Sequence, residues 1–541
     1  MRASGERRVL ALRPDRGCLS RSAFEDKSPQ ANQYPQFGGM LRLGQPRSGA
    51  AVEIRCRGKQ SAAENNLDRF RDGPSNPRQV KSNPSDRSGP ARDLSAALAA
   101  ARETRALELS PGALEAIPEL LRRWFPGQSA VVVADANTFK AAGRKVLDLL
   151  LRAGMAVEEP VVFPGPGLVA EQRHVVALEE RLKVHPATIP LAVGSGTIND
   201  LVKLAAHRAH RRYLAVATAA SMDGYTAFGA SIDDQGSKQT VPCPAPLAAV
   251  ADLDVIGVAP PELNAAGYAD LAAKLTAGAD WLLADALGVE PLHASAWSIA
   301  QDGLRDALAE PAGVRGGEPG AIGRLTTGLM LTGFAMQAAS SSRPASGAEH
   351  QFSHLWDMEH HTFQGKVPLH GYKVGIGSLA AAALYEYVLK QPLEELDVDR
   401  CCAEWPDDAA RENLVRDLFG GSPLAGVALR ESAAKASSRV ELRTQLESLR
   451  GRWPQLRDRL RRQLIPFTEL KKMLRAAGAP VEPDEIGISR ERLRAAYVRA
   501  YFIRRRFTIL DLGFRTGLLE SGLAHIFGGG GPWSSDQGLK S

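Results

Sequence analysis

Histidines are concentrated in one stretch of the chain, residues 346–371, which holds five of the eleven. His350 and His354 are four residues apart, so on a helix they would lie on the same face about one turn apart. His370 follows Pro368, where a helix is expected to have ended, and a loop could bring it back to the same place. Two histidines from one helix and a third from elsewhere commonly bind a metal ion. The alternative is a chance cluster at a polar helix end.

One acidic residue in an apolar stretch could complete such a metal site. Asp270 lies in the segment GYADLAAK, where Lys274 follows four residues later. A helical ion pair worth about 0.2–0.5 kcal/mol is the simpler interpretation of this spacing. A carboxylate with two imidazoles would instead leave an open position on a divalent ion that acts as a Lewis acid. Zinc, nickel and iron all accept these ligands, so the sequence does not select among them.

Two short segments of small and polar residues each follow an apolar run typical of a buried strand. GSGTIND (194–200) follows TIPLAV and opens a helical pattern, and TAASMDGYT (218–226) follows RRYLAV. Glycine lets a ligand approach the backbone closely, and free N–H groups at a helix start favour phosphate. The GSG turn alone could be only a tight turn, because it is not a GxGxxG motif. Two such loops at one sheet edge favour a nucleotide site.

The elements expected around these segments form an open sheet followed by helices. Apolar runs alternate with helical patterns up to Thr218, which is typical of a doubly wound, mostly parallel sheet. Prolines between Thr226 and Asp254 favour a hairpin or extended segments, and long Ala- and Leu-rich helical patterns follow Pro260. We therefore expect an α/β nucleotide-binding domain at 93–257, an all-helical domain at 258–528, and the active site in the cleft between them.

Composition and charge narrow the class of protein. The chain is 44% hydrophobic and 24% charged, as soluble globular proteins are. It has neither an apolar run long enough for a membrane span nor a secretory signal, and its five scattered cysteines favour reduced thiols, so a cytoplasmic protein is expected. The net charge of +6 arises in residues 1–92, which hold 18 Lys/Arg against 9 Asp/Glu. That polar, Pro/Gly/Ser-rich segment predicts a disordered basic extension without the features of a nucleic-acid-binding domain, and residues 529–541 predict a flexible tail.

Seven segments taken together carry a family resemblance. They are GSGTINDLVK, TAASMDGYT, VPCPAPLAAVADLDV, AGYADLAAK, SGAEHQFSHLWDM, LHGYKVGIG and RRRFTILDLGFRTGLL, in order between about residues 95 and 525. This set resembles the sn-glycerol-1-phosphate dehydrogenases, within the superfamily of iron-containing alcohol dehydrogenases, glycerol dehydrogenases and dehydroquinate synthases. The combination of MDGYT, AEHxxSH and LHG resembles this family more closely than it resembles ordinary glycerol dehydrogenases.

The resemblance implies a reaction and a set of site residues. The reaction is reversible hydride transfer from NADH or NADPH to dihydroxyacetone phosphate, a phosphorylated three-carbon substrate, by an enzyme with one divalent metal ion (zinc, nickel or iron). We also expect a homodimer or higher homo-oligomer. The metal ligands would be Asp270, His350 and His370, and the catalytic residues Asp270 and His354. Substrate contacts would come from Asp223, Asp270, His354 and Lys274. Cofactor contacts would come from Gly194, Ser195, Gly196, Thr197, Ile198, Thr218, Ala219, Ala220 and Ser221. Ala227, which stands where the family usually has serine, would lie beside the cofactor as well. Asp135 is a further candidate, because it is an acid at a strand end where a ribose could bind.

The substrate phosphate needs a positive charge nearby, and the sequence offers Lys203, Lys238, Lys274 and His354 as candidates. Three other functions remain open at this point. A lyase of the dehydroquinate synthase kind could use the same fold, as could another polyol dehydrogenase of the superfamily. A basic-armed interaction protein derived from an enzyme is the non-enzymatic alternative.

Overall fold

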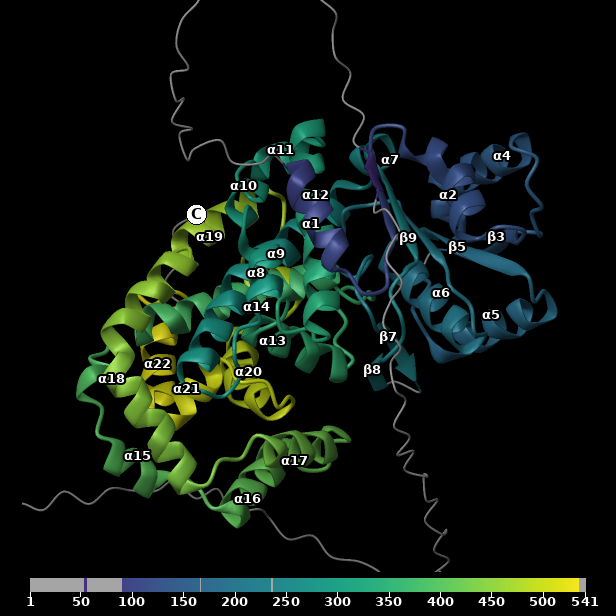
Figure 1. Ribbon diagram of the computed structural model, residues 1–541. Coiled ribbons are helices and arrows are strands. Elements are labelled where there is room, and N and C mark those ends of the chain that lie inside the picture. The colour runs from purple at the N-terminus through teal and green to yellow at the C-terminus, as the bar shows by residue number, and fades with distance from the viewer. Residues whose placement is uncertain (1–52, 56–89, 166, 235–236, 535–541) are drawn as a thin grey trace, which may run out of the picture. The chain divides into compact units, whose positions relative to one another are not determined.

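The computed structural model describes residues 53–55, 90–165, 167–234 and 237–534. Seven parallel strands form its main sheet, in the order β1-β2-β9-β6-β5-β3-β4 (Figure 1). Helices follow the last of these strands, so the predicted fold class is confirmed. The strands are β1 Glu53–Arg55, β2 Ala106–Ser110, β3 Ser129–Asp135, β4 Val161–Phe163, β5 Thr188–Gly194, β6 Leu214–Ala217 and β9 Ala248–Asp252.

Helices cover both faces of this sheet. α2 (Ile117–Trp124) and α4 (Arg144–Arg152) pack with strand side chains such as Val132 and Leu191 in one apolar core. α5 (Gln172–Val184) and α6 (Gly196–Arg208) lie against the other face, with Val131 and Val133. Because both faces are covered, the strands β3, β5, β6 and β9 are almost uninterrupted runs of buried, mostly apolar residues.

The segment after β6 differs in part from its prediction. β7 (Ala230–Asp234) and β8 (Ser237–Val241) form the expected antiparallel hairpin. The chain then returns to the main sheet as β9, which pairs in parallel with β2 on one side and β6 on the other. The prolines of VPCPAP lie before this strand, so they do not interrupt it.

Ser110 followed by Pro111 predicts a helix start, with serine as the cap and proline at the first helical position, but the helix begins later. Ser110 ends β2, a 3₁₀ turn follows at Ala113–Ala116, and α2 starts only at Ile117. The cause is a carboxylate from another strand: Asp252, at the end of β9, accepts hydrogen bonds from the N–H groups of Gly112 (3.0 Å) and Leu114 (3.1 Å). These bonds cap the turn where the local sequence predicted serine as the cap.

The predicted extension overlaps the described residues only in part. Glu53–Arg55 form β1 and pair with β2, and α1 (Pro90–Ala100) begins three residues before Asp93. The rest of the extension, residues 1–52 and 56–89, lies outside the described residues, as do residues 535–541 of the tail. Disorder of these segments therefore stays a prediction.

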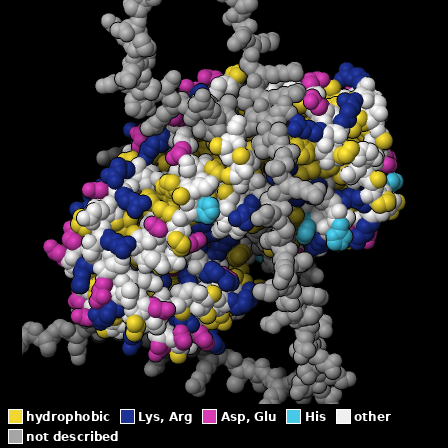
Figure 2. Space-filling model, viewed as in Figure 1, with side chains coloured by type: hydrophobic (Ala, Val, Ile, Leu, Met, Phe, Trp, Pro, Cys, Tyr) yellow, Lys and Arg dark blue, Asp and Glu magenta, His cyan; other side chains and the backbone are white. Residues whose placement is uncertain are grey.

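Beyond β9 the described chain is helical. On the face shown in Figure 2, acidic and basic side chains are interspersed. Among the described residues, no helix combines the length and apolar character that crossing a membrane requires. The helices are α7 Leu253–Gly257, α8 Pro261–Ala286, α9 Ala294–Gln301, α10 Leu304–Ala307, α11 Pro311–Gly316, α12 Pro319–Ala339, α13 Ala348–Met358, α14 His370–Val388, α15 Val398–Glu404, α16 Asp408–Phe419, α17 Leu424–Ala434, α18 Arg439–Gln463, α19 Phe467–Ala476, α20 Arg490–Phe502, α21 Ile509–Arg515 and α22 Leu518–Phe527.

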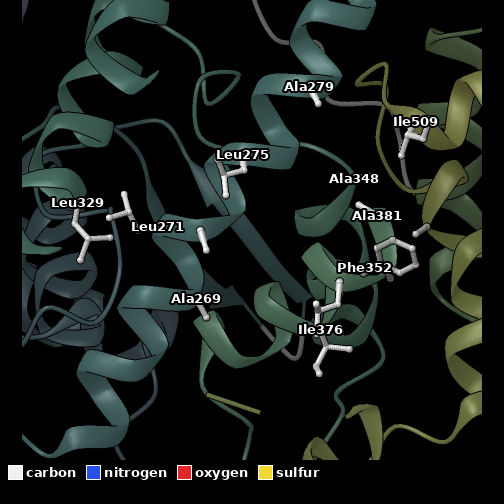
Figure 3. Close-up of a cluster of buried hydrophobic side chains, with 14 of the residues drawn as sticks. Ala269, Leu271, Leu275, Ala279, Leu329, Ala348, Phe352, Ile376, Ala381 and Ile509 are labelled. Carbon is white, nitrogen blue, oxygen red and sulfur yellow. The ribbon is translucent and has the colours of Figure 1, made fainter. Parts of the chain in front are cut away.

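Helix α8 forms the centre of the helical core. Most of its 26 residues are buried, polar ones included. Figure 3 shows Leu271 and Leu275 of α8 among apolar side chains of neighbouring helices, including Leu329 of α12 and Phe352 of α13. Because the middle of α8 is packed on all sides, the charged side chains of Asp270, Lys274 and Asp280 are held inside the protein and must find partners there.

Backbone segments pack closely around α8 at glycines. A Cβ atom added at Gly267 would overlap the carbonyl oxygen of Ala220, in the loop after β6. A Cβ atom at Gly371, near the start of α14, would overlap the carbonyl oxygen of Ala266. Glycine is required at both positions because only hydrogen leaves room for the opposing backbone. These contacts seat α8 between the sheet edge and α14.

We expect Gly267→Ala to destabilise the protein, by about 1–3 kcal/mol for overpacking at a contact with rigid backbone. Gly451→Ala is the matched control, because Gly451 also lies inside a helix but a Cβ atom there would meet no atom within 4 Å. That control should be stabilised by roughly 0.5–1 kcal/mol, since alanine favours a helix over glycine. Urea unfolding of both variants measures the difference, and equal effects would contradict the close contact.

Candidate active site

The two predicted ligand loops meet at the carboxyl edge of the sheet. β5 ends at Gly194, β6 is its neighbour, and the N–H of Thr218 donates to the carbonyl of Gly194 at 3.2 Å. Helix α6 begins at Gly196, directly after β5, and Ser195 at its start makes no capping hydrogen bond with its side chain. The segments 194–198 and 218–221 are therefore adjacent, and the start of α6 presents backbone N–H groups of the kind that bind phosphate.

Asp135 lies at the same edge, at the end of β3 next to β5. Its carboxylate caps the helix that follows: Oδ1 accepts from the N–H of Asn137 at 2.8 Å and from that of Thr138 at 3.0 Å. The side chain is partly exposed, and its position at the strand end is the one expected for a ribose contact. Capping is the role that the structure shows.

Ala227 is buried, 4% exposed, as are the predicted cofactor residues Ala219 and Ala220. Its side chain is buried against Met336 and Ala345. Its carbonyl accepts a hydrogen bond from Lys203 Nζ at 2.8 Å. The residue thus contributes to the packing behind the loop that carries Asp223.

Lys203 has a structural role in this loop. Its buried ammonium group donates to three carbonyl oxygens, of Gly224 (3.0 Å), Ala227 (2.8 Å) and Gly229 (3.0 Å). An ammonium group has three N–H donors, so all the hydrogen-bond donors of Lys203 are occupied by groups of the protein. Lys203 is therefore a poor candidate for the substrate phosphate. The side chain of Lys238, another candidate, lies outside the described residues.

Donor atoms for a metal ion converge beside α8. One donor atom each from Asp270, His350 and His370 lie within 4.8 Å of one another. The Nδ1 atom of His350 lies 2.9 Å from Oε1 of Glu349, which leaves its Nε2 facing Asp270, with 3.7 Å between Nε2 and Oδ1. A carboxylate on the far nitrogen is the usual way to orient a metal-binding histidine.

The protonation of His350 also suits a metal ligand. Burial lowers the pKa of His350 well below its usual value, and the positive charges of Lys274 and Arg504 lower it further. The imidazole is therefore neutral at pH 7, as metal binding requires. The donor set, one carboxylate and two imidazoles, fits a divalent transition metal.

His354 belongs to the same histidine cluster but not to the group of metal donors. Its ring centroid lies 6.0 Å from that of His350 and 6.4 Å from that of His370. Burial lowers its pKa well below the usual value, and the nearby charge of Arg504 lowers it further. His361 instead serves the fold, since its Nε2 contacts the carbonyl of Ile486 at 2.7 Å.

Lys274 connects the metal donors to the loop after β6. Its Nζ lies 2.7 Å from Asp270 Oδ1 and 2.8 Å from Asp223 Oδ2, and Lys274 and Asp270 are fully buried. The N–H of Asp223 donates to the other Asp270 oxygen at 3.1 Å. Burial acts to lower the pKa of Lys274, but the two carboxylates raise it above its usual value, so the lysine stays charged. Asp223, Asp270 and Lys274 form one buried ionic cluster.

Three residues of the site were missed by the sequence analysis. Glu349 orients His350, as described above. Asn264 of α8 accepts a hydrogen bond from the N–H of Ala220 at 3.0 Å and so holds the loop after β6. Arg504 places a positive charge near both His350 and His354. Glu349 lies in the segment AEH and Arg504 in the segment RRRF. For Glu349, an acidic residue directly before a candidate metal-binding histidine was the signal that the sequence offered.

Comparisons with known proteins identify the family of this chain. The model of the iron-containing alcohol dehydrogenase family matches residues 108–260. The chain is 34% identical to glycerol-1-phosphate dehydrogenase (NAD(P)+) of Halalkalibacterium halodurans over 290 residues, 53% of this chain and 72% of that protein. It is 34% identical to the enzyme of the same name from Bacillus velezensis over 389 residues, 71% of this chain and 84% of that protein.

A solved structure shows the same fold. Glycerol dehydrogenase from Schizosaccharomyces pombe matches with a TM-score of 0.50 at 16% identity, covering 81% of this chain and 92% of that chain. The family model shows a similarity to iron-containing alcohol dehydrogenases over residues 108–260. The identity and coverage of the relatives show that the chain belongs to the glycerol-1-phosphate dehydrogenase family. The resemblance seen in the sequence is confirmed.

Replacing Lys274 with methionine should destabilise the protein by roughly 3–5 kcal/mol, because it leaves two buried carboxylates without their cation. Lys183→Met is the matched control: Lys183 also pairs with an acid four residues away, Glu179, at 2.6 Å, but its side chain is 59% exposed. Loss of that pair should cost less than about 0.5 kcal/mol. Chemical denaturation compares the two, and similar losses would refute the role of the buried cluster.

Proposed function

We propose that this protein catalyses the reversible reduction of dihydroxyacetone phosphate to sn-glycerol 1-phosphate, with NADH or NADPH as hydride donor and one divalent metal ion. The observation that carries the proposal is the group Asp270, His350 and His370 held beside the loop after β6. The name of the relatives, glycerol-1-phosphate dehydrogenase (NAD(P)+), supports the substrate and the cofactor.

The arrangement suits hydride transfer. Asp223 extends from the loop that follows β6, and its backbone bonds to the metal donor Asp270. A nicotinamide cofactor bound along residues 194–198 and 218–221 would thus end next to the substrate position. Hydride transfer needs this proximity, because the donor carbon and the acceptor carbonyl must be brought together and oriented.

Each residue of the site has a proposed part. Asp270, His350 and His370 would hold the metal ion, which when bound polarises the substrate carbonyl. Asp223 and Asp270 would accept hydrogen bonds from substrate hydroxyl groups. His354, neutral at pH 7, would hold the substrate and move a proton at a ring nitrogen. Lys274 would keep the two carboxylates ionised and in place.

Arg504 is proposed to bind the substrate phosphate. The dianion needs a counter-charge, and both Lys203 and Lys274 are already committed within the protein. Arg504 is partly exposed, and its charge lies close enough to His354 to lower that residue's pKa. A guanidinium group offers paired N–H donors that match phosphate oxygens.

We further propose that the protein works in the cytoplasm as a homodimer or larger homo-oligomer, with domains at 93–257 and 258–528. Free thiols at Cys243, Cys401 and Cys402 support a reducing compartment. The family resemblance is what supports the oligomer, and sedimentation of the purified protein tests it.

The activity is tested by incubating the purified chain with dihydroxyacetone phosphate, NADH or NADPH, and zinc, nickel or iron in turn. Oxidation of the cofactor should yield sn-glycerol 1-phosphate, identified with a stereospecific assay, and chelation of the metal should abolish turnover. If no metal supports oxidation, the proposal is wrong. Phosphate release from a sugar-phosphate substrate would instead favour a lyase of the dehydroquinate synthase kind.

The roles of the two α13 histidines are separable. We expect His350→Ala to lose bound metal, because it removes one of three donors. His354→Ala should retain metal and lose substrate affinity or turnover by about tenfold or more. Metal content is measured by mass spectrometry and turnover by NADH oxidation. Equal loss of metal in both variants would show that the helical pair binds the ion jointly.

Arg504→Gln should raise KM for dihydroxyacetone phosphate by about tenfold or more, the usual effect of losing a hydrogen bond to a charged group. Arg505→Gln is the matched neighbour, since Arg505 is 66% exposed and pairs with Glu431 on the surface. Inhibition by inorganic phosphate should weaken only in the Arg504 variant. An unchanged KM would assign the phosphate to another cation.

A further inference from the structure

A cavity lies among α15, α16, α20 and α21. Figure 1 labels these four helices. The cavity volume is about 350 Å³, within the range of small-molecule sites. None of its lining residues is among those proposed to bind metal, cofactor or substrate. The cavity therefore needs an explanation of its own.

Aromatic side chains form much of the cavity wall. Tyr501 and Phe502 come from α20, Phe514 from α21, and Trp405 from the segment after α15. The rings of Tyr501 and Phe514 are stacked, with centroids 4.1 Å apart and planes 30° apart. The other face of Tyr501 is covered by the ammonium group of Lys435, 3.5 Å from the ring centroid. Phe514 is half-buried and lines the cavity, so its ring favours a flat, aromatic ligand packed against it.

Two guanidinium groups line the same cavity. Arg515 is 3% exposed, and its Nε is buried without a hydrogen-bond partner. Its Nη1 donates to the neutral amide of Gln445, and no carboxylate of a described residue is within ion-pair distance of it. The Nε of Arg411 is also buried and unpaired, although its Nη1 pairs with the exposed Asp408 at 2.5 Å.

The charge of Arg515 is therefore only partly compensated. Its guanidinium lies 4.8 Å from the ring centroid of Phe507 and 5.9 Å from that of Trp405. Aromatic faces attract a cation but do not neutralise it. The buried acid Asp511 is paired with Lys435 at 3.1 Å. Glu404, the acid of the cavity lining, is exposed to solvent. A buried cation of this kind is stabilised by an anion.

We propose that this cavity binds a planar aromatic molecule that carries an anionic group, a carboxylate or a phosphate. The ring lies against Phe514, and the anionic group accepts hydrogen bonds from the guanidinium groups of Arg411 and Arg515. The proposal does not rest on the proposed dehydrogenase function, since it uses none of the residues of that site.

Matched probes test the proposal by titration calorimetry on the full-length protein: 2-naphthoate, 2-naphthyl phosphate and the neutral 2-naphthamide. Both naphthalene anions share the ring, so their relative affinities distinguish the carboxylate from the phosphate. At least one anion should bind about tenfold or more tightly than the amide, because the amide lacks the charge-assisted hydrogen bonds. Binding should persist with saturating NADH.

Two variants test whether the probes bind in this cavity. Arg411→Gln should weaken the anion about tenfold or more and leave the amide nearly unchanged. Ala436→Trp fills the cavity from an exposed lining position and should abolish binding of all three probes. Circular dichroism confirms that both variants are folded. Equal binding of amide and anions, displacement by NADH, binding that survives Ala436→Trp, or absence of binding would each overturn the proposal.

Discussion

A lysine buried between two carboxylates governs how the two parts of this fold meet. Lys274 is fully buried, and it lies within hydrogen-bond distance of Asp270 on its own helix and of Asp223 on the loop after β6. A charge in such surroundings is tolerable only with its partners in place. The loop of the sheet and helix α8 must therefore come together in one arrangement. That arrangement also places Asp270, a proposed metal ligand, beside the sheet edge where the nucleotide is proposed to bind.

A second buried carboxylate on α8 fixes the remaining elements of the site. Asp280 accepts hydrogen bonds from the N–H of Ala348, at the start of α13, and from the N–H of Ile509, at the start of α21, both at 2.7 Å. Burial raises the pKa of Asp280 to about 7, with the neighbouring carboxylate of Glu349 as the next cause. Helix α13 carries His350. By fixing the start of α13, Asp280 therefore also fixes the position of His350 relative to Asp270.

Much of this structure was predictable from the sequence because it follows from local pattern. The strand-helix alternation, the glycine-rich loops and the histidine spacing all act over a few residues. β9 was missed because its neighbours in the sheet, β2 and β6, are distant in sequence. The cap on Leu114 was missed for the same reason, since its acceptor Asp252 is far along the chain. The proposed metal ligands Asp270, His350 and His370 came as a set from family resemblance, whereas spacing alone had favoured His350 with His354.

Lys203 shows how the loop bearing Asp223 keeps its shape. Three carbonyl oxygens of residues 224–229 converge on one ammonium group at 2.8–3.0 Å, much as carbonyls surround a bound potassium ion. In this loop the cation is attached to the chain through α6, so it cannot dissociate or exchange with solvent ions. The backbone beside the proposed substrate position thus owes its order to a tethered ion, and that order is independent of the salt in which the protein works.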